Sequence, residues 1–247
     1  VMFMQDHFDR NNINVEMVNG GVEGYRPRDL LIEVERYKAI KPDIVMIYIG
    51  WNAIYSDAGN ISSIYKLSAL WRYINKITRY IAFLSVDPKA EAYRLLNKEK
   101  HVDMRSPDIE ALNSYEPRSF HYIKKLTEEL EGSGASIVLV TLPGLFTMDR
   151  TPDKKSLEIG HLPQETQNPY VLAKLTSRYN EALRVFADEN DYELIDLSAW
   201  SDENLLPPTS YFTDSVHMSL WGMERVGHFL AESLNQLSNL KIGKQRE

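Results

Sequence analysis

The sequence predicts an α/β fold built on a parallel β-sheet, and two kinds of pattern predict it. Three short and almost continuously apolar runs occur along the chain, at residues 43–49, 136–142 and 192–197. Such runs are typical of strands that are buried on both faces of a parallel sheet. Stretches with helical spacing of apolar residues lie between and after them, and this alternation of strand and helix favours parallel connections.

Length and composition limit the architecture and the partners. A chain of 247 residues can bury one sizeable core, so we expect a single domain over residues 1–247. The composition, 43% hydrophobic and 26% charged, is ordinary for a soluble globular protein. A net charge of −7 argues against a nucleic-acid partner, because phosphate binding needs a clustered positive surface. The absence of cysteine excludes disulfides, thiolate catalysis and zinc–cysteine sites.

The first forty residues contain two predicted helices and one predicted short strand. Residues 1–8 have helical apolar spacing, and residues 15–18 (Val-Glu-Met-Val) predict a short strand. A glycine-rich turn at 19–25 follows, and Pro27 suits the first turn of a helix over about 28–39.

Three further helices are predicted from stripes of apolar residues at helical spacing. Their apolar stripes are Phe120, Ile123, Leu126 and Leu130; Leu172, Leu175, Tyr179, Leu183 and Phe186; and Val226, Phe229, Leu230, Leu234 and Leu237. The polar stretch 154–168 predicts a surface loop. Residues from about 54 to 115 are too long for a simple connection, so we expect a helical insertion or cap there.

A carboxylate and an imidazole occur three residues apart in the loop before the last helix, as Asp214 and His217. In a loop, this spacing lets the carboxylate bond one ring nitrogen, which fixes the tautomer and leaves the other nitrogen free as a base. Such a base normally activates a nucleophile. The alternative is a structural pair, or a capping aspartate beside a surface histidine.

As a metal pair, Asp214 and His217 lack evident companions. We expect the other histidines to be surface or packed residues, because they occur in unrelated contexts: His7, His101, His121, His161 and His228. No metal site is predicted.

Gly24 and Asn52 each follow a predicted strand and are candidate oxyanion donors. In an open parallel sheet, ligands bind beyond the carboxyl ends of the strands. The Asn52 amide and the Gly24 backbone N–H can both donate to one developing oxyanion. Each residue also has a plainer interpretation, as a turn glycine or a turn or cap asparagine. Gly20-Gly21-x-x-Gly24 does not match the dinucleotide-binding Gly-x-Gly-x-x-Gly pattern.

Three sequence blocks together resemble the SGNH hydrolases, also called GDSL-like lipases or acylhydrolases. They are residues 19–24 (Asn-Gly-Gly-Val-Glu-Gly), 50–52 (Gly-Trp-Asn) and 214–222 (Asp-Ser-Val-His-Met-Ser-Leu-Trp-Gly), in the family's order across nearly the whole chain. Ser219 and Gly222 match the family's usual sequel to the histidine, which we interpret as helix start and packing.

The resemblance implies a flavodoxin-like three-layer α/β/α sandwich and serine ester hydrolysis without a cofactor. It implies that Gly24 and Asn52 are oxyanion donors, His217 is the base and Asp214 is its orienting partner. The substrate would be a small-molecule, glycan or lipid ester, such as the O-acyl ester of a carbohydrate or a lipid.

Two departures from the family pattern affect this prediction. Ala53 stands where the family usually has an aspartate after the asparagine, and the chain contains no Gly-Asp-Ser nucleophile block. We therefore expect the serine and the first central strand to lie upstream of Val1, and the chain without them to be inactive. Localisation stays open, since secretion, a periplasmic location and a membrane anchor are all compatible.

Two other functions remain open at this point. The missing serine and Ala53 also fit a catalytically silent SGNH-like domain that binds a glycan or an assembly partner, and an acyltransferase or thioesterase could use the same site. The aromatic and basic stretch 67–84 could touch a membrane peripherally. We favour an ordinary amphipathic helix packed on the domain.

Overall fold

The computed structural model describes residues 1–58, 99–163 and 166–237. Its helices and strands are, in chain order, α1 (Met2–Arg10), α2 (Pro27–Ile32), α3 (Val34–Lys38), β1 (Ile44–Ile47), α4 (Trp51–Ala58), α7 (Pro107–Ala111), the 3-10 helix η2 (Leu112–Ser114), α8 (Phe120–Glu131), β2 (Ser136–Val140), α9 (Lys154–Ile159), α10 (Pro169–Glu189), β3 (Glu193–Ile195), α11 (Leu197–Asn204), the 3-10 helix η3 (Pro208–Ser210) and α12 (Leu220–Gln236).

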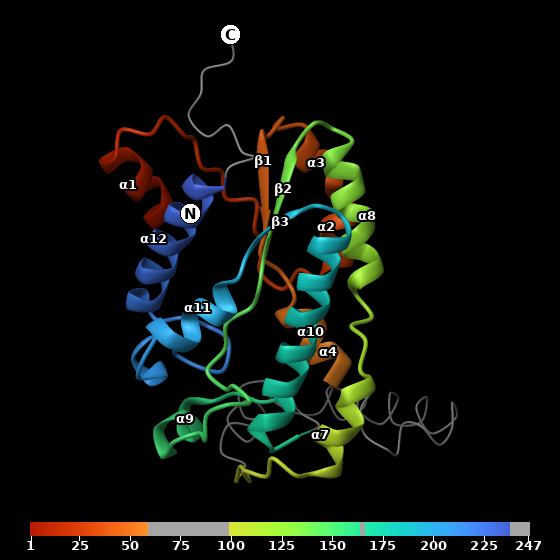
Figure 1. Cartoon of the computed structure of the whole chain (residues 1–247), viewed down its shortest axis with the longest axis vertical. Helices are drawn as coiled ribbons and strands as arrows, with labels where there is room; N and C mark the ends of the chain where they lie inside the picture. Colours follow the sequence, from red (N-terminus) through yellow and green to blue (C-terminus); the bar gives the residue numbers. More distant parts are fainter. Residues whose placement is uncertain (59–98, 164–165, 238–247) are drawn as a thin grey trace, which may run out of the picture.

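The sheet is parallel throughout and lies between two layers of helices. Its order is β1-β2-β3, with Ile47 opposite Leu139 and Val140 opposite Ile195. Helices α1, α11 and α12 cover one side, and α2, α3, α8 and α10 cover the other (Figure 1). The predicted α/β class, with its parallel sheet in three layers, is therefore confirmed.

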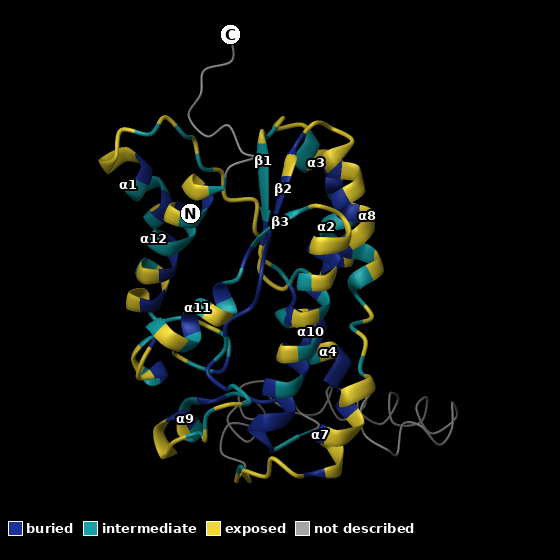
Figure 2. Cartoon of the chain, viewed as in Figure 1, coloured by how far each residue is buried: buried dark blue, intermediate teal, exposed yellow. Residues whose placement is uncertain are grey.

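The central and outer strands differ in burial (Figure 2). Residues 138–140 of β2 are fully buried, as the apolar run predicts. In β1 only Ile47 is buried, and residues 44–46 are half-buried. The prediction of burial on both faces is thus wrong for most of β1. The reason is its position, because within the described residues β1 pairs with β2 alone.

One helix, α10, holds the carboxyl ends of all three strands. Its buried Tyr179 donates a 2.6 Å hydrogen bond to the Ile49 carbonyl after β1. Asn180, on the same helix, bonds both the N–H and the carbonyl of Leu142 after β2, at 2.8 and 2.9 Å. Burial of these polar groups costs little because each has a partner.

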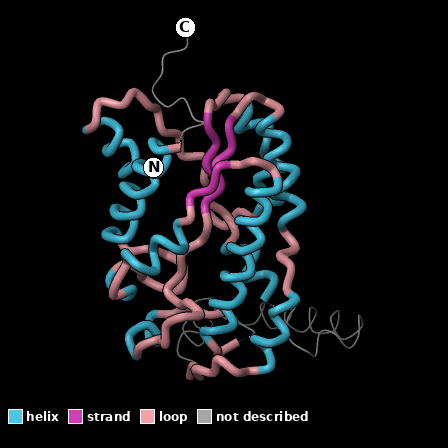
Figure 3. The backbone as a smooth tube through the Cα atoms, in the orientation of Figure 1, coloured by secondary structure: helices cyan, strands magenta, loops and turns pink. Residues whose placement is uncertain are grey.

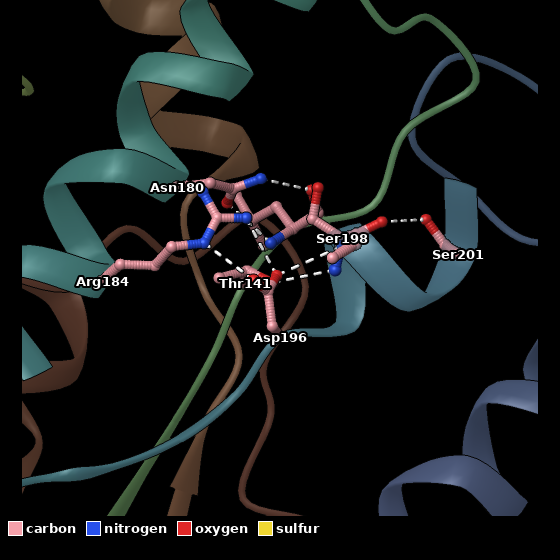
Figure 4. Close-up of polar contacts among 8 residues, drawn as sticks. Thr141, Asn180, Arg184, Asp196, Ser198 and Ser201 are labelled. Carbon is pink, nitrogen blue, oxygen red and sulfur yellow. Dashed lines mark hydrogen bonds and ion pairs between the residues drawn. The ribbon is translucent and has the colours of Figure 1, made fainter. Parts of the chain in front are cut away.

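A third α10 side chain reaches the end of β3. Arg184 donates from Nε and Nη2 to the two carboxylate oxygens of Asp196, at 2.8 and 2.9 Å (Figure 4). The Thr141 hydroxyl donates to the same carboxylate and accepts from the Ser198 N–H. Asp196 also caps α11 through the Ala199 N–H at 3.2 Å. The ends of β2 and β3 are therefore joined by charged and neutral hydrogen bonds.

Three local predictions differ from the structure. Residues 15–18 form no strand and lie in the loop between α1 and α2 (Figure 3). Their backbone is instead satisfied by Gln5, which donates to the Val15 carbonyl and accepts from the Met17 N–H, both at 2.8 Å. An amide side chain thus takes the place of a neighbouring strand.

The other two differences concern helix boundaries. The helix predicted over 28–39 is divided at Glu33 into α2 and α3. The stretch 154–168, predicted as a loop, begins with the short helix α9, which Asp153 caps by accepting from the Ser156 N–H. The stretch is too polar to show a clear apolar stripe, so the sequence marks the helix only by the capping residue at its start.

Much of the predicted insertion at 54–115 lies outside the described residues, which leave out 59–98 and with them the stretch 67–84. The described flanks are bonded to each other. Asp57 of α4 accepts from the Tyr115 hydroxyl at 2.7 Å and from the Arg118 N–H at 3.3 Å. None of the helices in the described ranges is both long and apolar enough to cross a membrane.

Candidate active site

The loop between η3 and α12 is closed on itself and presents the predicted base at its tip. Phe212 and Met218 form an isolated antiparallel bridge. Inside it, the backbone N–H and the hydroxyl of Thr213 both donate to the His217 carbonyl, at 2.8 and 3.1 Å. The side chain of His217 is left 76% exposed. The loop therefore holds the backbone of the histidine while its ring faces solvent.

Asp214 and His217 form the pair that the sequence predicts. Nδ1 of His217 lies 2.7 Å from Oδ2 of Asp214. The other oxygen, Oδ1, accepts from the backbone N–H groups of Val216 and His217, both at 2.8 Å. With the Nδ1 proton directed at the carboxylate, Nε2 is the nitrogen free to accept a proton.

The protonation state of Asp214 suits this role. Burial alone would raise the pKa of its carboxyl group. The N–H groups of Val216 and His217 and the histidine ring outweigh burial, and together they hold the pKa of Asp214 below its ordinary value. The carboxylate is therefore ionised at neutral pH and can stabilise an imidazolium.

The start of α12 secures the other end of the loop. The Ser219 hydroxyl accepts from the Gly222 N–H at 3.2 Å and donates to the Ser210 carbonyl at 2.9 Å. A Cβ at Gly222 would collide with the carbonyl oxygen of Tyr211. The structural roles predicted for Ser219 and Gly222, helix start and close packing, match this geometry.

The Gly50-Trp51-Asn52 block turns the end of β1 directly into α4. A Cβ at Gly50 would lie 2.6 Å from side-chain atoms of both Leu142 and Tyr179, so only glycine fits. Asn52 follows on the first turn of α4 with an exposed side chain.

Asn52 also meets the glycine-rich loop. Its Nδ2 donates to the Tyr25 carbonyl at 3.0 Å. Gly24, the residue before, is exposed and has φ of +80°, a conformation that favours glycine. The structure thus brings the two candidate donors to one place, and the second N–H of the Asn52 amide can serve a ligand.

The site has a donor half (Gly24 and Asn52) and a base half (Asp214 and His217). The two halves meet at Gly144, after β2. A Cβ at Gly144 would lie 3.2 Å from Cη2 of Trp51 and 3.6 Å from the Ser215 carbonyl oxygen. That carbonyl accepts from the Leu145 N–H at 3.0 Å. The loop after β2 is therefore hydrogen-bonded to the Asp214–His217 loop, and it contacts the start of α4, where Asn52 lies.

Sequence reasoning missed two side chains beside this site, Tyr55 and His161. Their rings stack with centroids 5.6 Å apart, and the Tyr55 hydroxyl donates to the His161 carbonyl at 2.7 Å. Burial lowers the pKa of His161; the charge of Asp214 opposes this and that of His217 adds to it. No sequence signal marks this neighbourhood, because His161 and His217 are brought together only by folding.

No hydroxyl group in the described residues is hydrogen-bonded to the His217 ring. Ser215 and Ser219 are the serines nearest to it in sequence. Ser215 is 1% exposed with its hydroxyl enclosed beside Tyr55, and the Ser219 hydroxyl is engaged by Ser210. Across the described ranges, no group of three or more His, Asp or Glu side chains is placed to hold a metal ion.

Comparison with known proteins identifies the fold. No protein-family model and no curated protein matches the sequence. Among solved structures, the acetylxylan esterase Axe2 from Geobacillus stearothermophilus is similar with a TM-score of 0.55 at 17% identity, over 99% of this chain and 82% of that one. LAE5, an α/β hydrolase enzyme from the metagenome of Lake Arreo, gives 0.56 at 17% identity, over 97% and 82%.

A GDSL-like lipase from Bacteroides thetaiotaomicron gives a TM-score of 0.51 at 12% identity, over 96% of this chain and 82% of that one. The fold of this chain is therefore that of the SGNH/GDSL hydrolases, as the three sequence blocks predict. At these identities the likeness concerns the fold, and the site has to be argued from its own residues.

Proposed function

We propose that this protein is a serine ester hydrolase that cleaves an O-acyl ester. The observation that carries the proposal is the 2.7 Å bond between His217 Nδ1 and Asp214, which leaves Nε2 of an exposed ring available as the base. The hydrogen bond from Asn52 to the carbonyl of Tyr25, the neighbour of Gly24, supports it. Similar structures that are described as an acetylxylan esterase and a GDSL-like lipase support ester hydrolysis as the reaction class.

In the proposed reaction, a serine hydroxyl attacks the acyl carbonyl carbon while His217 Nε2 takes its proton. The negative oxygen of the tetrahedral intermediate accepts hydrogen bonds from the Gly24 N–H, the Asn52 amide and the N–H of the serine itself. Asp214 keeps the imidazole in the correct tautomer and stabilises its positive charge. Collapse of the intermediate breaks the bond to the alcohol, which leaves with the proton from His217.

Water completes the cycle. His217 takes a proton from water as its oxygen attacks the acyl-serine, and the proton returns to the serine when the carboxylic acid leaves. The reaction needs no cofactor, since each proton removed from an oxygen is returned to one. We propose that the attacking serine belongs to a Gly-Asp-Ser block, as the family resemblance implies, and the experiments below use the full-length protein.

The test is replacement of His217 by alanine, assayed with p-nitrophenyl acetate. We expect kcat/KM to fall between about 10⁴- and 10⁶-fold, the range for loss of one triad member. The matched control is His121→Ala on α8, an exposed histidine whose Nδ1 lies 2.8 Å from the Arg118 carbonyl oxygen and whose ring packs against Tyr122, and it should leave kcat/KM unchanged. Equal activity of wild type and His217→Ala would contradict the proposal.

The second candidate is a catalytically silent domain of the same fold that binds a glycan or an assembly partner. The observation that favours it is that no described hydroxyl contacts the His217 ring, together with Ala53 in place of the family's aspartate. Wild-type protein with no esterase activity, combined with saturable binding of an oligosaccharide, would favour this candidate over the hydrolase.

A further inference from the structure

A groove with a volume of about 410 Å³ is lined by residues that precede and follow the His217 loop in the chain. It lies between the end of η3 and the outer face of the first turns of α12. Its walls consist of aromatic and polar side chains: Ser210, Tyr211, Trp221, Glu224, Arg225 and His228. This volume is within the range of small-molecule sites.

The groove is part of the same structural unit as the base. The Tyr211 carbonyl accepts from the Ser219 N–H at 2.8 Å, and these two residues immediately flank the Phe212–Met218 bridge that closes the His217 loop. Trp221 lies four residues after His217 in the chain, in the first turn of α12, and is 70% exposed. A ligand in the groove therefore lies next to the loop that presents Nε2.

The chemistry of the walls suits a neutral, hydroxyl-rich ring. Trp221, which is largely exposed, offers an aromatic face to the C–H face of a sugar, and the Arg225 guanidinium lies over the Tyr211 ring, 5.6 Å from its centroid. Glu224, Arg225 and His228 offer both donors and acceptors for hydroxyl groups. One carboxylate and one guanidinium cancel in charge, which disfavours a strongly charged ligand.

The same composition disfavours an acyl chain. None of the six wall residues is aliphatic, whereas a hydrocarbon chain gains most from apolar walls. The exposed apolar side chains nearby, Leu220 and Met223, are on α12 but do not line the groove.

We propose that this groove binds a sugar ring of the substrate's alcohol portion, so that the protein acts on carbohydrate esters rather than lipid esters. The inference rests on the proposed ester hydrolase function and adds the substrate class. Trp221 is then a specificity-determining residue and not a catalytic one, since it stacks on the part of the substrate that does not react.

The experiment compares Trp221→Ala with wild type on three probes: mono-O-acetylated xylobiose, p-nitrophenyl acetate and p-nitrophenyl palmitate. We expect kcat/KM on the sugar ester to fall about 10-fold, mainly through KM, with the other two probes unchanged. Leu220→Ala is the matched control, because its side chain is 61% exposed on the same turn but outside the groove. It should behave as wild type on all three.

Three results would overturn the inference: an unchanged rate on the sugar ester, an equal loss on p-nitrophenyl acetate, or a loss on the palmitate alone.

A direct binding measurement makes the test independent of turnover. In the His217→Ala background, calorimetric titration with acetylated xylobiose should show binding that Trp221→Ala weakens by a similar factor. Binding with no activity in wild type would contradict the proposed function alone, and absence of binding would contradict the groove.

Discussion

The two halves of the candidate site are built differently. The base half is bonded to the loop after β2 through the Ser215 carbonyl, and both oxygens of Asp214 accept hydrogen bonds. The donor half, at the end of β1, is more exposed, and one 3.0 Å bond from Asn52 to the Tyr25 carbonyl joins its two loops.

The difference follows from position in the sheet. β2 is central and buried, so the loops that follow it are held from several sides, whereas β1 is partnered on one edge only within the described residues. A base must be oriented before the reaction starts, while oxyanion donors act when charge develops. The orientation of His217 is thus fixed by local bonds, and the donors depend on how the β1 edge is packed.

The largest expected effect concerns the donor half and is a loss of kcat. Asn52→Ala should lower kcat by about 10²- to 10³-fold on p-nitrophenyl acetate, because it removes one oxyanion donor. The free energy of unfolding should change little, since the side chain is exposed and makes one hydrogen bond. Asn190→Ala, at the far end of α10, is the control and should leave kcat unchanged. An unaltered kcat for Asn52→Ala would show that Asn52 is a turn residue and no donor.

An intermediate effect is expected on stability, from the ion pair that joins α10 to the end of β3. Asp196→Asn keeps the cap of α11 but removes the charge that Arg184 pairs with. We expect a loss of about 1–2 kcal/mol in the free energy of unfolding, at the lower end for a charged hydrogen bond, because the two side chains are 39% and 35% exposed. Urea denaturation measures it, with the exposed Asp188→Asn as a control that should change stability by less than about 0.5 kcal/mol.

The smallest effect expected is the pH dependence of the difference in unfolding free energy between wild type and Asp196→Asn. Burial alone would raise the pKa of Asp196, but the Arg184 guanidinium, the Ala199 N–H and the Thr141 hydroxyl hold it below its ordinary value. A depressed folded-state pKa contributes stability above the unfolded pKa of about 3.9, and this contribution is lost as pH falls through the folded value. The stability difference between wild type and Asp196→Asn should therefore be constant near neutrality and shrink below about pH 4. A difference that grows on acidification would contradict the ion pair.

Much of the fold could be predicted because apolar periodicity reports burial directly. The three strand cores and the helices α8, α10 and α12 lie where their patterns place them. The failure at residues 15–18 has a tertiary cause. Residues 15–18 have strand composition, but whether they form a strand depends on a neighbour to pair with, and here the Gln5 side chain provides the hydrogen bonds instead.

For the site, the sequence by itself determined the local pairs. The three-residue spacing of Asp214 and His217 is enough to specify their bond, and the glycine before Trp51 is enough to turn β1 into α4. The contacts that only the tertiary structure decided join residues far apart in the chain. Asn52 meets the Tyr25 carbonyl, and Trp51 meets Gly144 beside the histidine loop. Such contacts depend on strand order and helix packing, which no local spacing encodes.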